Sequence, residues 1–333
     1  MKRIAIVFLA FIGVGLLLVA LDPQRAKRAV FMATMFQGVD MTDEFSDMQS
    51  LFPFHPVRTS NPTPLATAAT EFALPLTYEY QGETRNLRDF LQETDTSGLI
   101  VLRDGQVIYE EYALGSSPPG TFNHYNSTDS HVLGMLLVRA TGKTLAAYTE
   151  EKLWQPLQME HDAYWITDAL GMELAAGGLN ATLRDYARLG ELYRNHGRWA
   201  GRQVVPEAWV TASTVPGKPH LKAGKRAGSD MILGYGYQWW TPPTGNEGEY
   251  SAIGVYNQFV YVNPDKAVVI AKTSASRAYG VDESTDRELE TLHVFNTIAR
   301  ALGDPAGVDE EEAAGARDRK VSPPPSQPAL QSE

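Results

Sequence analysis

Apolar and polar positions alternate near residue 100 and again over the last third of this 333-residue chain. Residues 99–102 and 107–112 are rich in branched and aromatic side chains and flank a polar turn at 103–106. The Asp-Gly pair in that turn favours the positive φ angles of a tight reversal, so the pattern predicts a β-hairpin. Further strands are predicted, with a connecting turn at 263–265, over 234–240, 250–254, 258–262 and 267–272.

Helical spacing of apolar residues fills the region between these two sets of strands. A helix capped at Asp129 or Ser130 ends at Gly142, and a second begins at Thr144 and ends before Pro156. A capping box at 182–185 and a proline at 206 predict two more helices. Strands at both ends with helices between them predict an α+β body in which the first and last strands share one sheet.

The N-terminus, residues 1–28, is predicted to be a membrane anchor or a signal. A short basic head precedes an uncharged run over residues 4–21, which corresponds to roughly 27 Å of helix. That length is close to the roughly 30 Å thickness of a bilayer core. A poor small-x-small cleavage pattern favours an uncleaved anchor over a cleaved signal or a buried helix, with the body on the periplasmic or extracellular side.

Composition divides the rest of the chain. Residues 304–333 carry seven acids, three bases and a Pro-Pro-Pro run, which predicts a disordered acidic tail. Residues 29–74 are punctuated by prolines and are predicted to form an extended linker or wrap. The folded domain is therefore expected over residues 75–303.

Charge and residue types exclude several classes of function. The chain has 29 Lys and Arg against 40 Asp and Glu, a net charge of -11, so no nucleic-acid partner is expected. The absence of cysteine excludes disulfides, thiol nucleophiles and cysteine zinc sites. The seven histidines form no His-x-x-x-His pair, and no phosphate-binding loop motif occurs, so neither a metal nor another cofactor is expected.

Five pieces of sequence, in order along the chain, resemble a known family. They lie at 119–134, 140–143, 153–157 and 177–182, and at 234–240 followed by 254–258. Together they resemble the β-lactamase-related serine hydrolases, which include class C β-lactamases, penicillin-binding proteins, esterases and 6-aminohexanoate-dimer hydrolase. The resemblance implies a β-lactamase/transpeptidase-like antiparallel sheet with flanking helices. It also implies hydrolysis of a small-molecule ester or amide through an acyl-enzyme.

The resemblance also implies roles for particular residues. Family members acylate the serine of a Ser-x-x-Lys motif, and the lysine and a tyrosine from a Tyr-x-Asn/Ser loop relay its proton. Tyr125-x-Ser127 fits that loop, with Tyr125 as the proton relay. A third motif, Lys/His-Thr/Ser-Gly, falls at 252–254, where Gly254 fits and Ala252 replaces the cation. Ala252, Gly254 and Tyr256 are the predicted substrate contacts, and the missing cation favours an esterase or amide hydrolase over a penicillin-type activity.

The Ser-x-x-Lys motif itself is absent, because no lysine of the chain has a serine three residues before it. Family members carry a helical segment with the nucleophile after the hairpin, whereas here residues 112–117 meet the Pro-Pro-Gly of 118–120 directly. An internal deletion near 112–120 is therefore predicted, with a truncated helical part and no hydrolysis by the family route. The deletion also predicts an exposed apolar face on the sheet, where the lost helix would pack.

Three hypotheses stay open. The chain is a serine hydrolase of this lineage whose nucleophile segment was lost by deletion or by a gene-model error. Alternatively, it is a catalytically silent, membrane-tethered binding protein that uses the cleft around Tyr125 and the aromatic strand at 235–240. The third hypothesis is a structural envelope protein without a ligand, since aromatic residues at strand spacing are more often core.

Overall fold

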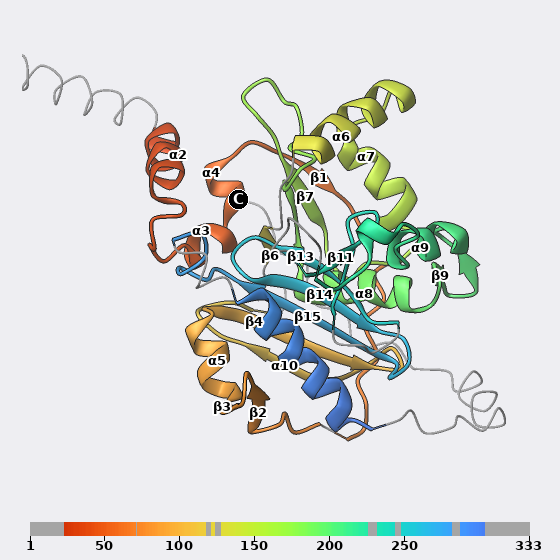
Figure 1. The fold of residues 1–333 in the computed structure, drawn as a ribbon. Helices are drawn as coiled ribbons and strands as arrows, with labels where there is room; N and C mark the ends of the chain where they lie inside the picture. Colours follow the sequence, from red (N-terminus) through yellow and green to blue (C-terminus); the bar gives the residue numbers. More distant parts are fainter. Residues whose placement is uncertain are drawn as a thin grey trace, which may run out of the picture.

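The computed structural model describes residues 23–70, 72–117, 121–123, 128–225, 232–243, 248–281 and 287–303. A seven-stranded antiparallel sheet crosses the middle of the molecule (Figure 1). In spatial order its strands are β11 (Gly234–Tyr235), β12 (Trp240–Thr241), β13 (Tyr250–Gly254), β14 (Gln258–Asn263), β15 (Val268–Ser274), β4 (Thr96–Arg103) and β5 (Gln106–Tyr112). Because β15 pairs with β4, the early hairpin and the late strands form one sheet, as the sequence predicts.

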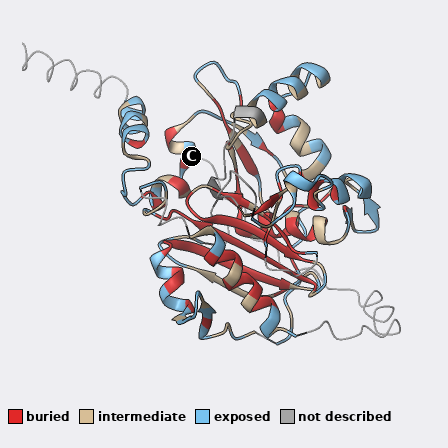
Figure 2. Ribbon diagram, viewed as in Figure 1, coloured by how far each residue is buried: buried red, intermediate tan, exposed pale blue. Residues whose placement is uncertain are grey.

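Helices cover both faces of this sheet. On β14, Val260 and Val262 pack against α8 (Leu183–Arg194), while Phe259 and Tyr261 pack against α10 (Glu288–Ala301). Every residue of β14 and β15 is buried, which Figure 2 shows as a red band across the molecule. The close approach of α8 requires a glycine, because a Cβ at Gly190 would lie 2.6 Å from a methyl group of Val269.

The prediction that one apolar face of the sheet is exposed is wrong for the described residues, because α8 and α10 cover its two sides. Exposed apolar side chains occur instead on α6 (Thr128–Thr141), where four of them are 49–60% exposed: Val132, Leu133, Met135 and Leu136. This helix contacts the body along a narrow line at Gly134, where a Cβ would lie 2.3 Å from that of Ala175. The apolar face predicted for α6 therefore points largely to solvent.

The other predicted helices are confirmed. The segment from Leu145 begins as α7 (Leu145–Thr149), continues as a π-helical turn (Glu150–Trp154) and ends before Pro156, as expected. The capping box forms at the start of α8, where Thr182 Oγ1 accepts from the Asp185 N–H and donates to Asp185 Oδ2. The fourth helix is α9 (Glu207–Thr214), which directly follows Pro206.

Smaller elements surround the central sheet. A four-stranded sheet has the order β1 (Phe54–Val57), β7 (Ala163–Ile166), β8 (Leu179–Thr182) and β6 (Thr121–Asn123). Two hairpins join β2 (Thr77–Tyr80) to β3 (Glu83–Asn86) and β9 (Arg198–Trp199) to β10 (Arg202–Gln203). The remaining helices there are α5 (Leu87–Glu93) and a 3₁₀ turn (Pro219–Leu221).

The first part of the predicted linker is helical, contrary to the expectation of an extended chain over 29–74. It contains the second half of α2 (Pro23–Thr34), whose first half lies in the predicted region 1–28, and all of α3 (Thr42–Ser46) and α4 (Met48–Leu51). The reason is hydrophobic burial: Phe31, Phe45 and Met48 form a third core cluster against the turn between β13 and β14. The prolines that suggested an extended segment begin at residue 53, and the chain is extended from there.

Within the described ranges, no helix combines the length and the apolar character that a membrane span requires. The predicted anchor at 4–21 and the predicted tail at 304–333 lie outside those ranges. The boundaries proposed for the regions of the chain therefore remain predictions.

Candidate active site

Strand β13, which the sequence assigns to substrate binding, borders a cleft of about 370 Å³. This volume lies within the range of roughly 300–1,000 Å³ that small-molecule sites occupy. The lining residues come from α6, β7, β8 and the segment before it, the β11–β12 turn and β13: Ser130, Leu133, Trp165, Ala175, Ala176, Gly177, Leu179, Gln238, Ala252 and Ile253. The cleft is mainly apolar, with one hydroxyl and one amide side chain among these residues.

Strand β13 is largely unpaired on one side. It pairs with β14 along its whole length from Tyr250 to Gly254, but it pairs with β12 only through Ser251 and Trp240. Among the described strands, none pairs with residues 252–254 on the β12 side. Backbone groups at such an edge can bind an extended ligand in the manner of an added strand.

The structure places the three predicted substrate contacts in different surroundings. Ala252 is half-buried and lines the cleft, while Gly254 is buried at the end of β13, opposite Gln258. Tyr256 lies in the following turn, is buried, and lines a neighbouring apolar cavity. Burial raises the pKa of Tyr256 to about 12. The backbone reverses here through φ angles of 61° at Tyr256 and 68° at Asn257, which turns the Tyr256 ring towards the N-terminal helices.

The predicted proton-relay loop lies outside the described residues, which resume at 128 after a gap at 124–127 that contains Tyr125 and Ser127. The described serine in the cleft is Ser130, in the first turn of α6. One helical turn later the chain has Leu133 rather than a lysine. The described cleft lining contains no lysine or histidine that could take a proton from Ser130.

The buried lysine of the sheet has a different position. Lys272 on β15 is 1% exposed, and its ammonium group donates to the main-chain oxygen of Asn257 at 2.9 Å and to the Asn257 side-chain oxygen. Burial, and secondarily the charge of Arg287, hold the pKa of Lys272 well below its usual range, while Asp95 opposes this shift. Lys272 therefore supports the turn that carries Tyr256, and it is not among the described residues that line the cleft.

Of the ten described residues that line the cleft, only Ala252 was predicted as a site residue from the sequence. The missed residues with a polar group in the side chain are Ser130, Trp165 and Gln238. The glycine pair at 177–178 was recognised as a tight backbone passage, and a Cβ at Gly178 would lie 2.7 Å from the Leu174 oxygen. Gln238 follows Gly236, where a Cβ would lie 1.8 Å from the Ser213 oxygen, so this turn also depends on a glycine. The glycines at these positions were the signals in the sequence that could have indicated the walls of the cleft.

The aromatic segment at 235–240 contributes mainly to packing. Trp239 is buried against the rings of Tyr193 and Tyr250, with centroid distances of 4.4 and 5.1 Å. Tyr237 is exposed and lies 5.0 Å from the ring of Trp209. None of these aromatic side chains is among the described residues that line the cleft. The interpretation of the aromatic residues at 235–240 as packing residues therefore fits better than their interpretation as a ligand-binding surface.

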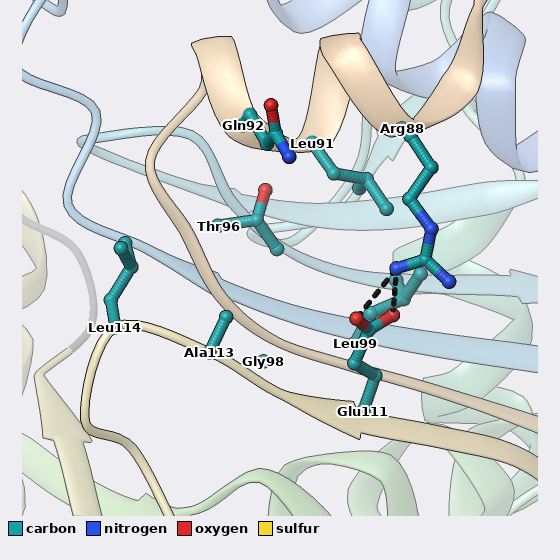
Figure 3. Close-up of a pocket in the computed structure, with 9 residues that line it drawn as sticks. All are labelled: Arg88, Leu91, Gln92, Thr96, Gly98, Leu99, Glu111, Ala113 and Leu114. Atoms are coloured by element: carbon teal, nitrogen blue, oxygen red, sulfur yellow. Dashed lines mark hydrogen bonds and ion pairs between the residues drawn. The ribbon is translucent and has the colours of Figure 1, made fainter.

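A second, smaller pocket of about 180 Å³ lies at the margin of the sheet, between α5 and the strands β4 and β5 (Figure 3). Arg88 of α5 and Glu111 of β5 form an ion pair on one side of it, with an N–O distance of 2.5 Å. The hydrogen bond to Glu111 raises the pKa of the Arg88 guanidinium. Because both charged groups already have partners, this pocket is a weaker candidate for a reaction site than the β13 cleft.

A family comparison now bears on this geometry. The family model described as Beta-lactamase matches residues 114–295, just over half of the chain. The chain belongs to the Beta-lactamase family. The matched range contains β13, α6 and the segment before β8, and thus every described residue that lines the cleft.

Individual relatives agree with this membership. The chain is 32% identical over 163 residues to the 6-aminohexanoate-dimer hydrolase of Paenarthrobacter ureafaciens, and the aligned segment is 48% of this chain and 41% of that protein. The chain thus spans less than half the length of this curated relative. A solved structure from Bacillus anthracis, provisionally described as a 6-aminohexanoate-dimer hydrolase, aligns with a TM-score of 0.66 and 17% identity, covering 80% of this chain and 95% of that one. This structural likeness confirms the predicted fold.

Proposed function

We propose that this Beta-lactamase-family chain binds a small, uncharged ester or amide in the β13 cleft and does not form an acyl-enzyme through the Ser-x-x-Lys route. One observation carries the proposal: nowhere in the 333 residues does a serine precede a lysine by three positions. Nucleophilic catalysis needs the nucleophile and its base in contact. The chain retains the serine hydrolase scaffold without that pair.

The nature of the ligand follows from the described cleft. Ala252 occupies the position where the family motif has a cation, so a substrate carboxylate has no partner there. The open edge of β13 favours a ligand with a carbonyl group that accepts a backbone hydrogen bond. The name of the relative indicates an amide substrate for that protein, which supports an amide or ester for this chain.

We also propose that residues 4–21 tether the protein to a membrane, with the body on the outer side. The basis is the uncharged, apolar run that follows the basic residues Lys2 and Arg3. Fractionation of cells that express the full chain tests this location, and recovery of the protein in the soluble fraction at its full mass would contradict it.

Activity-based labelling tests the catalytic part of the proposal. We expect a fluorophosphonate probe to label the full chain no more than the heat-denatured control, and p-nitrophenyl acetate to be hydrolysed at the background rate. The Ser130→Ala variant is the matched control, because Ser130 is the described serine of the cleft. Labelling that disappears in this variant would overturn the proposal and identify Ser130 as a nucleophile.

The competing hypothesis is an active hydrolase whose nucleophile segment is missing from the sequence as given. Sequencing of the gene around codons 112–120 distinguishes the two. An in-frame segment that encodes Ser-x-x-Lys would support an ordinary acyl-enzyme hydrolase, and an uninterrupted reading across these codons supports the binding function.

A further inference from the structure

A second cavity, of about 580 Å³, lies beside the β13 cleft and is larger than it. Its walls come from three places that are distant in sequence: the N-terminal helices, the segment 166–177, and the turn that carries Tyr256. The contacts from the helices are aromatic and methionine side chains, among them Phe31, Met35 and Met48. The cavity is partly open, and a mainly apolar lining of this size is typical of a small-molecule site.

Aromatic contacts beside the cavity join the N-terminal segment to the body and the N-terminal helices to one another. The ring of Phe45 lies 4.7 Å from that of Tyr256 in an edge-to-face arrangement, and the ring of Phe36 stacks on Tyr256 at 5.3 Å. Phe31 makes edge contacts with Phe45 and Phe52 at 6.1 and 5.9 Å. Aromatic pairs at these distances stabilise the packing of the helices around the cavity.

The cavity and the cleft share part of their walls. Ala176 and Gly177 line both of them. Two successive small residues at this point leave little side-chain bulk between the two spaces. The two spaces are therefore adjacent at Gly177, and a ligand that reaches past this residue from β13 would enter the cavity.

The polar groups of the cavity do not select an ion. Its described lining includes two basic residues, Arg28 and His131, and one acidic residue, Asp168. The Asp168 carboxylate already accepts hydrogen bonds from the N–H groups of Leu170 and Met172, at 2.8 and 2.9 Å. The remaining surface is mainly apolar, which favours an uncharged hydrocarbon group as the occupant.

We infer that this cavity binds the aliphatic chain of the ester or amide whose carbonyl end lies in the β13 cleft. The inference rests on the proposed function and specifies its ligand class as a medium-chain aliphatic acyl compound. In this arrangement the N-terminal helices form one wall of the ligand site, and the cleft forms the other end of it.

A homologous series of methyl esters, from butanoate to decanoate, tests the inference by titration calorimetry on the full chain. Each buried methylene contributes about 0.8 kcal/mol, so we expect the affinity to rise about fourfold per added carbon until the cavity is filled. An affinity that does not change with chain length would overturn the inference, while binding of the esters as such would leave the proposed function in place.

Two tryptophan variants, one on α2 and one in the turn directly after it, provide a matched pair. Met35→Trp fills part of the cavity, whereas Val30→Trp adds the same ring at a position of α2 that is 63% exposed and does not line it. We expect Met35→Trp to abolish the dependence on chain length and Val30→Trp to retain it. Equal behaviour of the two variants would contradict the inference. If Met35→Trp fails to fold, Met32→Glu places a charge at an exposed lining position and should lower the affinity for decanoate at least tenfold.

The end of the ligand that carries the carbonyl is tested separately. Ala252→Trp blocks the cleft and leaves the cavity unchanged, so we expect it to weaken the binding of all the esters by a similar factor. Full affinity for the long esters in Ala252→Trp would overturn the placement of the carbonyl in the cleft. Fluorophosphonate labelling reports on the catalytic proposal alone, so its outcome is independent of these titrations.

Discussion

Lys272 is a buried basic residue whose environment opposes its charge. It lies on β15 at full burial, with its ammonium group directed at the oxygens of Asn257. Thr291 of α10 donates to the same Asn257 side-chain oxygen at 3.1 Å. The turn between β13 and β14 is thus tied to a neighbouring strand and to a helix through one asparagine, which stabilises its positive φ angles.

The lowered pKa of Lys272 predicts a pH dependence of stability. The unfolded chain binds a proton at Lys272 up to about pH 10.4, whereas the folded chain releases it at a much lower pH. Between these values the unfolded state holds more protons, so the free energy of unfolding rises with pH, by up to about 1.4 kcal/mol per unit. Urea denaturation from pH 7 to 9.5 should show this rise, and Lys272→Met should reduce the slope.

The upper limit of pH 9.5 excludes the ionisation of the buried tyrosines from the comparison of the parent chain with Lys272→Met. Burial raises the pKa of Tyr256 to about 12, so this hydroxyl stabilises the fold at neutral pH and that contribution is lost only above about pH 10. An identical pH slope in the parent chain and in Lys272→Met would show that the buried lysine does not control this dependence.

At the scale of elements, Glu173 connects three segments, of which one, 166–177, borders both the cleft and the cavity. Its side chain, 4% exposed, accepts from the backbone N–H groups of Leu145 and Ala146 at 2.8 and 3.1 Å. The same carboxylate lies 2.9 Å from His55 Nδ1 on β1. It therefore fixes the start of α7, β1 and the segment 166–177 relative to one another.

Replacement of Glu173 by alanine should destabilise the protein substantially. The change leaves two buried N–H groups without an acceptor, and each such group destabilises the fold by about 1–3 kcal/mol. We therefore expect the free energy of unfolding to fall by about 2–4 kcal/mol. Glu173→Gln keeps an acceptor and should lose less. Both changes are measured by urea denaturation.

The matched control is Glu151→Gln, at an exposed carboxylate that pairs with Lys143 and Lys152. Exposed ion pairs contribute little to stability, so this variant should unfold like the parent chain. A Glu173→Ala variant as stable as Glu151→Gln would mean that water replaces the lost acceptor.

At the scale of the whole molecule, the N-terminal helices behave as part of the folded body. Phe31, Phe45 and Met48 share a core cluster with Ile166 of β7 and with Tyr256. Ion pairs join the same regions, since the Arg277 guanidinium contacts both Asp40 and Asp95, at 3.0 and 2.8 Å. Unfolding of these helices should therefore be coupled to unfolding of the sheet.

A double-mutant cycle on Phe45→Ala and Tyr256→Ala measures this coupling. For the edge-to-face pair we expect an interaction free energy of about 0.5–1.5 kcal/mol. The control cycle combines Phe45→Ala with Phe295→Ala, which belongs to a separate core cluster, and should be additive within about 0.5 kcal/mol. Additivity in both cycles would show that the N-terminal helices fold independently of the body.

Much of the fold could be predicted from the sequence because its signals are local. The Asp-Gly turn, the apolar run of β14 and the capping box of α8 each depend on residues within a few positions of one another, and the structure contains all three. The N-terminal helices were missed because their stability comes from Tyr256, more than 200 residues away. The spacing of prolines carries no information about a contact between residues so far apart in the sequence.

The sequence by itself determined the family, the shared sheet of early and late strands, and the absence of a Ser-x-x-Lys pair. These depend on residue identities and short spacings, which no packing arrangement can alter. Only the tertiary structure decided that Ala252 borders the cleft while Tyr256 turns away into an apolar cavity. It also decided that Lys272 supports a turn rather than a nucleophile, because burial and long-range contacts determine what each side chain can reach.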